Sequence, residues 1–152
     1  MKEYLINNLL SKIPEERIVV GNDLALATYT CNSVVNGTPE KYEHAAIIVC
    51  TAGYCSVKIN LEQHDIESPS LITIMPGQII EPVTTSSNFS AMVIALSKRF
   101  IDMINLPGWQ QSYLTMYNHP TQMLDEKQVN MMRFFYTVLH NAASDEENPF
   151  RL

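Results

Sequence analysis

The sequence predicts a mainly β protein, a small antiparallel barrel or sandwich, followed by C-terminal helices. Between residues 18 and 97, segments rich in Val, Ile, Thr and Tyr alternate with turn residues. The last two of these segments lie too close together for a helix to fit between them, so the sheet is mostly antiparallel. From residue 98 onward the apolar residues recur at helical spacing instead.

Length and composition agree with one folded domain. The chain has 152 residues, 46% hydrophobic and 17% charged, and is too apolar to be disordered. Its net charge of −6 argues against nucleic acid binding by this chain alone, because neutralising phosphates requires clustered Lys and Arg. The sequence has no apolar run of membrane-spanning length and no signal peptide, and its three cysteines fit a reducing compartment. We therefore expect a cytoplasmic protein.

Residues 1–17 are expected to form a short N-terminal helix, because Leu5, Leu9 and Ile13 lie four apart and share one face. The β region, 18–97, follows it. His64-Asp65, in a polar stretch of this region, is interpreted as a turn. The expected strands are Leu24–Cys31, Glu43–Ala52, Tyr54–Leu61, Ser70–Met75, Ile79–Thr84 and Phe89–Ser97.

The segment 98–152 is expected to be helical. Ser97 can cap the first helix, which Pro107-Gly108 ends, and a second short helix runs from Trp109 to about Asn118. Asp125 caps the last helix, with Gln128 at the third position completing a capping box. The polar stripe of this helix is narrow and consists of Asn130, Arg133, Thr137 and His140.

The rest of the last helix is apolar over a wider arc than packing on one surface requires. Two interpretations remain open. The helix is inserted between the barrel and other helices of its own chain, or it forms a subunit contact in a homodimer. The residues expected at that contact are Met131, Met132, Phe135, Val138 and Leu139.

The C-terminal tail contains Asn148-Pro149, a helix-start pattern that comes too late for a helix to form. We expect that the sequence is a fragment of a longer protein; a frayed tail is the alternative.

The sequence contains no phosphate-binding loop, no nucleophile elbow and no zinc-type cysteine spacing. We therefore expect no cofactor, no metal and no enzymatic activity. Cys50 and Cys55 flank the turn at Gly53 and are expected to lie near each other. Buried thiols that act as small hydrophobes are the favoured interpretation, and a redox pair is the alternative.

Candidate ligand contacts are Tyr29, Tyr42, His44, Ile80 and Glu81. The two tyrosines can offer hydroxyls to a bound molecule, or satisfy backbone carbonyls at a barrel end. His44 is either a hydrogen-bonded histidine of the core or rim, a ligand contact or a metal ligand. Glu81 points inward, where it would grip an amine or hydroxyl, or outward into solvent.

The turn at Gly53, the later turn at Pro76-Gly77 and the segment Phe89–Ser97 leading into helices resemble the small cupin barrel. More closely, residues 18–152 resemble the N-terminal sensor domain of AraC-type transcription regulators, particularly the Bacteroides kind. The resemblance implies a double-stranded β-helix (jelly-roll) barrel followed by dimerisation helices. It also implies a C-terminal helix-turn-helix domain that is absent here and through which alone DNA would be bound.

The sequence departs from the metal-binding cupins at the positions of their metal ligands. Metal-binding cupins carry two histidines and a glutamate before the first glycine turn and a further histidine after the Pro-Gly turn. The corresponding positions fall near Glu40, Tyr42, Ala46 and Ile80, so the ligand set is missing.

The resemblance therefore implies a domain that senses a small molecule, a sugar or another metabolite, in a barrel without a reactive centre. The alternatives are a small metal-independent cupin enzyme using His44 and Glu81 as acid and base, and a ligand-free association scaffold.

Overall fold

A computed structural model describes residues 16–30 and 38–145 of the chain. The expected N-terminal helix up to residue 15, Cys31 and the tail from residue 146 lie outside these residues. The strands are β1 (Glu16–Val20), β2 (Leu24–Thr30), β3 (Glu40–Lys41), β4 (Ala45–Ala52), β5 (Tyr54–Ile59), β6 (Glu62–Glu67), β7 (Ser70–Ile74), β8 (Ile79–Thr85), β9 (Ser90–Leu96) and β10 (Thr121–Met123). The helices are α1 (Lys98–Asp102), α2 (Trp109–Asn118) and α3 (Glu126–Ser144).

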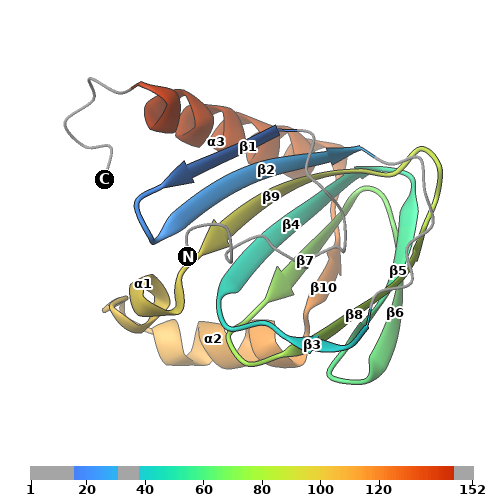
Figure 1. Cartoon of the computed structure of the whole chain (residues 1–152), viewed down its shortest axis with the longest axis horizontal. Helices are drawn as coiled ribbons and strands as arrows, with labels where there is room; N and C mark the ends of the chain where they lie inside the picture. The colour runs from blue at the N-terminus through green and yellow to red at the C-terminus, as the bar shows by residue number, and fades with distance from the viewer. Residues whose placement is uncertain (1–15, 31–37, 146–152) are drawn as a thin grey trace.

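The strands form two sheets that face each other (Figure 1). The larger has the order β1-β2-β9-β4-β7-β10 and the smaller β3-β8-β5-β6, and every pairing between described strands is antiparallel. Helix α3 lies along the outer face of the larger sheet, and α1 and α2 lie at one end of the barrel. The predicted fold class, mainly antiparallel β with C-terminal helices, is confirmed.

The larger sheet packs against other elements on both faces. Its inward residues meet those of the smaller sheet in one apolar core. Its outward residues, among them Leu26, Ile94 and Val49, pack beneath α3. A strand covered on both sides needs apolar residues at every position, which explains the unbroken run from Ala45 to Cys50.

Four strands were not predicted. Residues 16 and 17 belong to β1, not to the expected helix, because β1 pairs along its length with β2 across the turn at Gly21. The interpretation of His64-Asp65 as a turn is wrong, since both lie in β6. The turn is instead at Asn60-Leu61, where both residues have positive φ. Strands β3 and β10 have only two and three residues.

Strand β6 was not predicted, for a physical reason. Only Ile66 of β6 is buried, so this edge strand lacks the apolar alternation that marks a strand in the sequence. Backbone hydrogen bonds to β5 hold it in place, and these do not depend on side-chain type.

The predicted helix starts are confirmed. The Ser97 side chain accepts a hydrogen bond from the Phe100 N–H, and Asp125 and Gln128 form both bonds of the capping box. Helix α1 ends at Asp102, earlier than the expected stop at Pro107. Among the described helices, none has the length and apolar character needed to cross a membrane.

Candidate functional site

The barrel interior contains three of the five residues expected to bind a ligand. Tyr29, Tyr42 and Ile80 are 1%, 7% and 4% exposed and lie in the inner core. Burial, with Tyr29 nearby, raises the pKa of Tyr42 well above its ordinary value, so its phenol stays protonated. Ala46, at another position where the resemblance would place a metal ligand, faces the same core. Three of the positions where the resemblance would place metal ligands thus hold Tyr42, Ala46 and Ile80, which lie together in the core, whereas Glu40 is exposed.

Among the described residues, the cavity inside the barrel is small. The cavity found there measures about 20 Å³ and is lined by residues such as Ile48, Cys55 and Ile74. That volume holds about one water molecule, whereas small-molecule sites typically measure roughly 300–1,000 Å³. Ligand binding by Tyr29, Tyr42 and Ile80 remains a prediction that this packing does not support.

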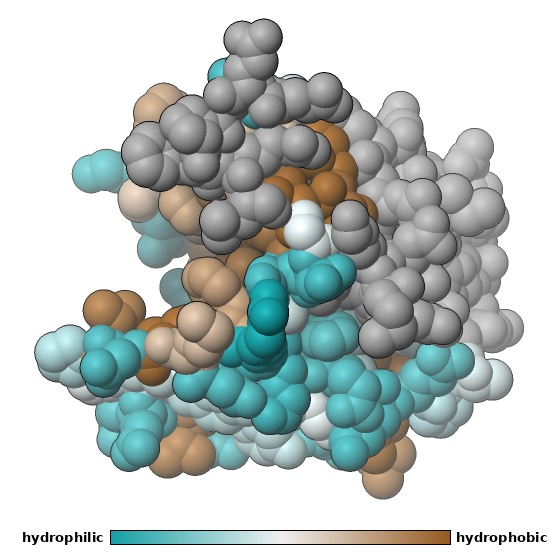
Figure 2. All heavy atoms as spheres, turned by 60° about the vertical axis from the view of Figure 1, so that its left-hand side comes forward, coloured by the Kyte–Doolittle hydropathy of each residue, from teal (hydrophilic) through white to brown (hydrophobic). Residues whose placement is uncertain are grey.

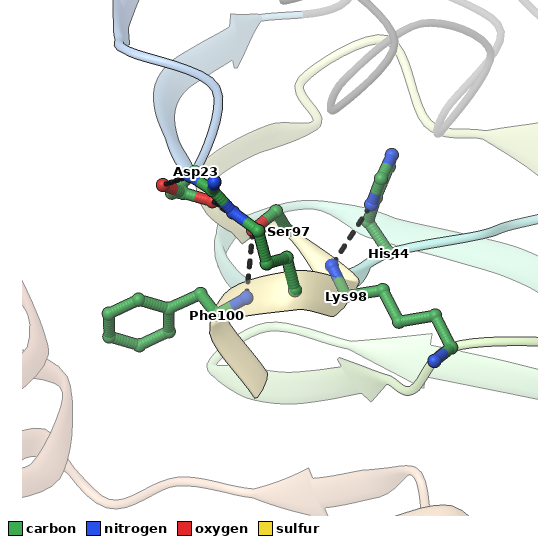
Figure 3. A network of polar contacts seen from close by, with 6 residues as sticks. Asp23, His44, Ser97, Lys98 and Phe100 are labelled. Carbon is green, nitrogen blue, oxygen red and sulfur yellow. Dashed lines mark hydrogen bonds and ion pairs between the residues drawn. The ribbon is translucent and has the colours of Figure 1, made fainter. Parts of the chain in front are cut away.

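His44 lies at the end of the barrel, beside the start of α1 (Figure 3). Its Nδ1 accepts a hydrogen bond from the backbone N–H of Lys98 at 3.1 Å, and its ring meets that of Tyr42 edge-on at 6.1 Å. Burial lowers the pKa of His44, although Glu43 acts in the opposite direction. A neutral imidazole that accepts a hydrogen bond from a free backbone N–H at a helix N-terminus agrees with the interpretation of His44 as a hydrogen-bonded rim histidine.

Glu81 lies on the outer side of β8, between the inward-facing Ile80 and Pro82. Its carboxylate is 3.6 Å from the Lys58 ammonium, on the neighbouring strand. The structure therefore does not bring Glu81 into one pocket with Tyr29, nor together with His44 as an acid–base pair. The outward-facing position of Glu81 is one of the two alternatives that the sequence left open.

Cys50 and Cys55 are buried free thiols on either side of the Gly53 turn, as their spacing predicted. The Cys50 thiol donates a hydrogen bond to Cys55, and this bond, together with burial, raises the pKa of Cys50 far above its ordinary value. This environment fits thiols that pack as small hydrophobes. Within residues 16–30 and 38–145, no group of three or more His, Cys, Asp or Glu side chains is arranged to hold a metal ion.

Helix α3 uses only one side against the sheet. Val129, Tyr136 and Ala143 are buried there, and Met132 and Leu139, two residues expected at a subunit contact, pack partly beside them. Met132 and Leu139 thus contribute to packing within the chain, and a subunit contact through them stays a prediction. A second apolar surface, here called the α3 outer face, remains exposed; Met131, Phe134, Phe135 and Val138 are 59%, 71%, 49% and 48% exposed.

Sequence reasoning missed an apolar cleft of about 410 Å³ between α3, α1 and the outer face of the larger sheet. Its floor and walls include Val20, Ile47, Ile94, Phe100, Phe135 and Leu139. On this side of the molecule, Figure 2 shows a hollow with apolar atoms around it. No local signal could reveal the cleft, because its walls come from segments more than a hundred residues apart.

The sequence matches no family model and no curated protein. Its structure is similar to cupin domains. The Schizosaccharomyces pombe Cnp3 cupin domain has a TM-score of 0.50 at 8% identity, over 60% of this chain and 68% of that one. An RmlC-like cupin from Shewanella frigidimarina has a TM-score of 0.46 at 9% identity, over 59% and 78%. Pac13 from Streptomyces, a nucleoside dehydratase, has 0.42 at 14%, over 53% and 75%.

These comparisons correct one expectation. We expected no enzymatic activity, but the solved structures to which this chain is similar include a nucleoside dehydratase. That expectation is therefore not upheld. At such low identities the likeness establishes the fold: the chain forms a cupin-like barrel with a C-terminal helix.

Proposed function

We propose that this chain is the association domain of a larger regulatory protein and pairs with a second copy through the α3 outer face. One observation carries the proposal: the four exposed apolar residues of that face. Met131, Phe134, Phe135 and Val138 are spaced three and four apart, so they form one continuous surface. A contiguous apolar surface of this kind marks an interaction site in most proteins.

A second copy of the chain fits this surface. A two-fold axis places the same patch of both subunits in contact, so one apolar helix face covers its own copy. The α3 outer face contains no charged residue that would repel its copy.

A finer proposal is that the larger protein is an AraC-type transcription regulator. The support for it is the resemblance carried by the Gly53 and Pro76-Gly77 turns and by the helices that follow Phe89–Ser97. In that family such helices mediate dimerisation. The proposal leaves out the expected ligand inside the barrel, where the cavity has room for about one water molecule.

The association test measures solution mass by sedimentation equilibrium. The wild-type chain is expected to be a dimer at micromolar concentration, and the double variant Phe134→Gln with Val138→Gln a monomer. The matched control changes two residues of the polar stripe, Asn130→Gln with Thr137→Gln, and is expected to stay dimeric. A monomeric wild type, or a double variant with unchanged mass, contradicts the proposal.

The regulator proposal has a separate test. The coding sequence that follows codon 152 is determined in the source genome. A basic segment with two helix-turn-helix units supports the proposal. A stop codon or a segment of another type contradicts it.

A further inference from the structure

We propose that the apolar cleft beside α3 binds an uncharged, mainly hydrocarbon small molecule. The site lies outside the barrel, and the inference goes beyond the proposed association and does not depend on it. The observation that supports it is a hollow of about 410 Å³ between six elements of the fold, β1, β2, β4, β9, α1 and α3. That volume falls within the usual range for small-molecule sites, roughly 300–1,000 Å³.

The cleft has the shape of a pocket, with a floor and several walls. Ile47 and Ile94 of the larger sheet form its floor, and Phe135 and Leu139 of α3 form one wall. Phe100 of α1 closes another side, with its ring directed away from the polar contacts of His44 and Lys98 (Figure 3). Walls from separate elements favour a compact molecule over an extended peptide.

The chemistry of the lining selects the ligand class. Asp23 is the one charged side chain among the described lining residues, and its carboxylate is already engaged. It accepts hydrogen bonds from the Ser97 hydroxyl at 2.6 Å and from Arg99 through Nε and Nη2. A ligand carboxylate would meet the negative charge of Asp23, and a ligand amine would compete with Arg99. An uncharged apolar molecule disturbs neither interaction.

A large apolar hollow in contact with water is unfavourable, since about 25 cal/mol is gained for each Å² of apolar surface removed from water. A hydrocarbon ligand gains this free energy without needing a polar partner. Sugars and nucleotides have little hydrocarbon surface to bury and would lose hydrogen bonds to water. The described lining side chains are apolar except for Asp23, whose carboxylate is already hydrogen-bonded.

The test uses Nile red, an uncharged apolar fluorophore, titrated onto the wild-type chain, with decan-1-ol and decanoate as competitors. We expect saturable binding of one fluorophore per chain, displaced by decan-1-ol at lower concentration than by ionised decanoate. Displacement by decanoate at equal or lower concentration overturns the uncharged class.

Two variants locate the site. Ala142 lines the cleft near its mouth, so Ala142→Trp fills it without removing a contact. Asn141→Trp adds the same side chain to the neighbouring exposed position, outside the cleft lining. Binding is expected to weaken about tenfold or more in Ala142→Trp only, a difference of about 1.4 kcal/mol. Circular dichroism checks that both variants fold.

Equal affinities of the two variants overturn the inference. So does the absence of saturable binding to the wild type, the outcome expected if a second copy or a flanking segment of the chain fills the cleft. Loss of dimerisation in the variant Phe134→Gln with Val138→Gln leaves Nile red binding intact, because neither residue lines the cleft. The two proposals therefore fail separately.

Discussion

Nδ1 of His44 accepts a hydrogen bond from the backbone N–H of Lys98, which joins the rim of the barrel to the first turn of α1 (Figure 3). Only the neutral imidazole in the tautomer that carries its proton on Nε2 can accept this bond. Ser97 and Asp23 hold the same helix end from the other side. The start of α1 is therefore held by Asp23, which lies in the turn before β2, and by His44, which directly precedes β4.

The first prediction concerns pH. Burial lowers the folded-state pKa of His44 below its ordinary value of 6.5, so the unfolded chain binds this proton more readily. The stabilisation is complete above pH 6.5 and is lost as the pH falls through the folded-state pKa. We expect the free energy of unfolding to fall between about pH 7 and 5 by more in the wild type than in His44→Gln, which does not titrate. Urea denaturation across this range measures it, and parallel curves for the two proteins refute it.

The second prediction concerns the cap of α1. Ser97 is buried, its oxygen accepts the Phe100 N–H at 3.0 Å, and its hydroxyl donates to Asp23. Ser97→Ala is expected to lower the free energy of unfolding by about 1–2 kcal/mol, because it removes both bonds. Ser97→Thr keeps the hydroxyl and serves as the control, with a smaller loss expected. Chemical denaturation gives both values; equal losses would show that side-chain volume, not capping, decides the effect.

The third prediction compares two glycines with nearly equal φ. Gly53 and Gly108 have φ of +75° and +76°. A Cβ at Gly53 would lie 2.9 Å from the Phe89 Cα and still closer to the Ser86 hydroxyl, whereas at Gly108 it meets nothing within 4 Å. Both alanine variants carry the left-handed backbone cost of about 1–2 kcal/mol.

Only Gly53→Ala adds overpacking, so it is expected to lose about 1–3 kcal/mol more than Gly108→Ala. Thermal or urea unfolding of the two variants gives this difference directly. If Gly108→Ala proves as damaging as Gly53→Ala, the close approach of the Gly53 turn to Phe89 is not what constrains this position.

Much of the fold followed from local patterns. Cap residues such as Ser97 and Asp125 act on backbone groups three positions away, so a few consecutive residues suffice to place a helix start. Strands with apolar inward residues, such as β4 and β9, were equally visible. Strand β6 was not, because a polar edge strand depends on hydrogen bonds to a neighbour that the sequence does not identify.

The candidate sites divide in the same way. Sequence alone predicted that α3 is apolar over more than one face, that Cys50 and Cys55 lie near each other, and that the positions of the cupin metal ligands hold Glu40, Tyr42, Ala46 and Ile80. These are properties of composition and short spacing. Only the tertiary structure decided that the described barrel residues enclose a small cavity, that Glu81 faces outward, and that an apolar cleft lies between α1, α3 and the larger sheet. Volume inside a fold depends on how side chains from distant segments meet, and that packing is not encoded in any one segment.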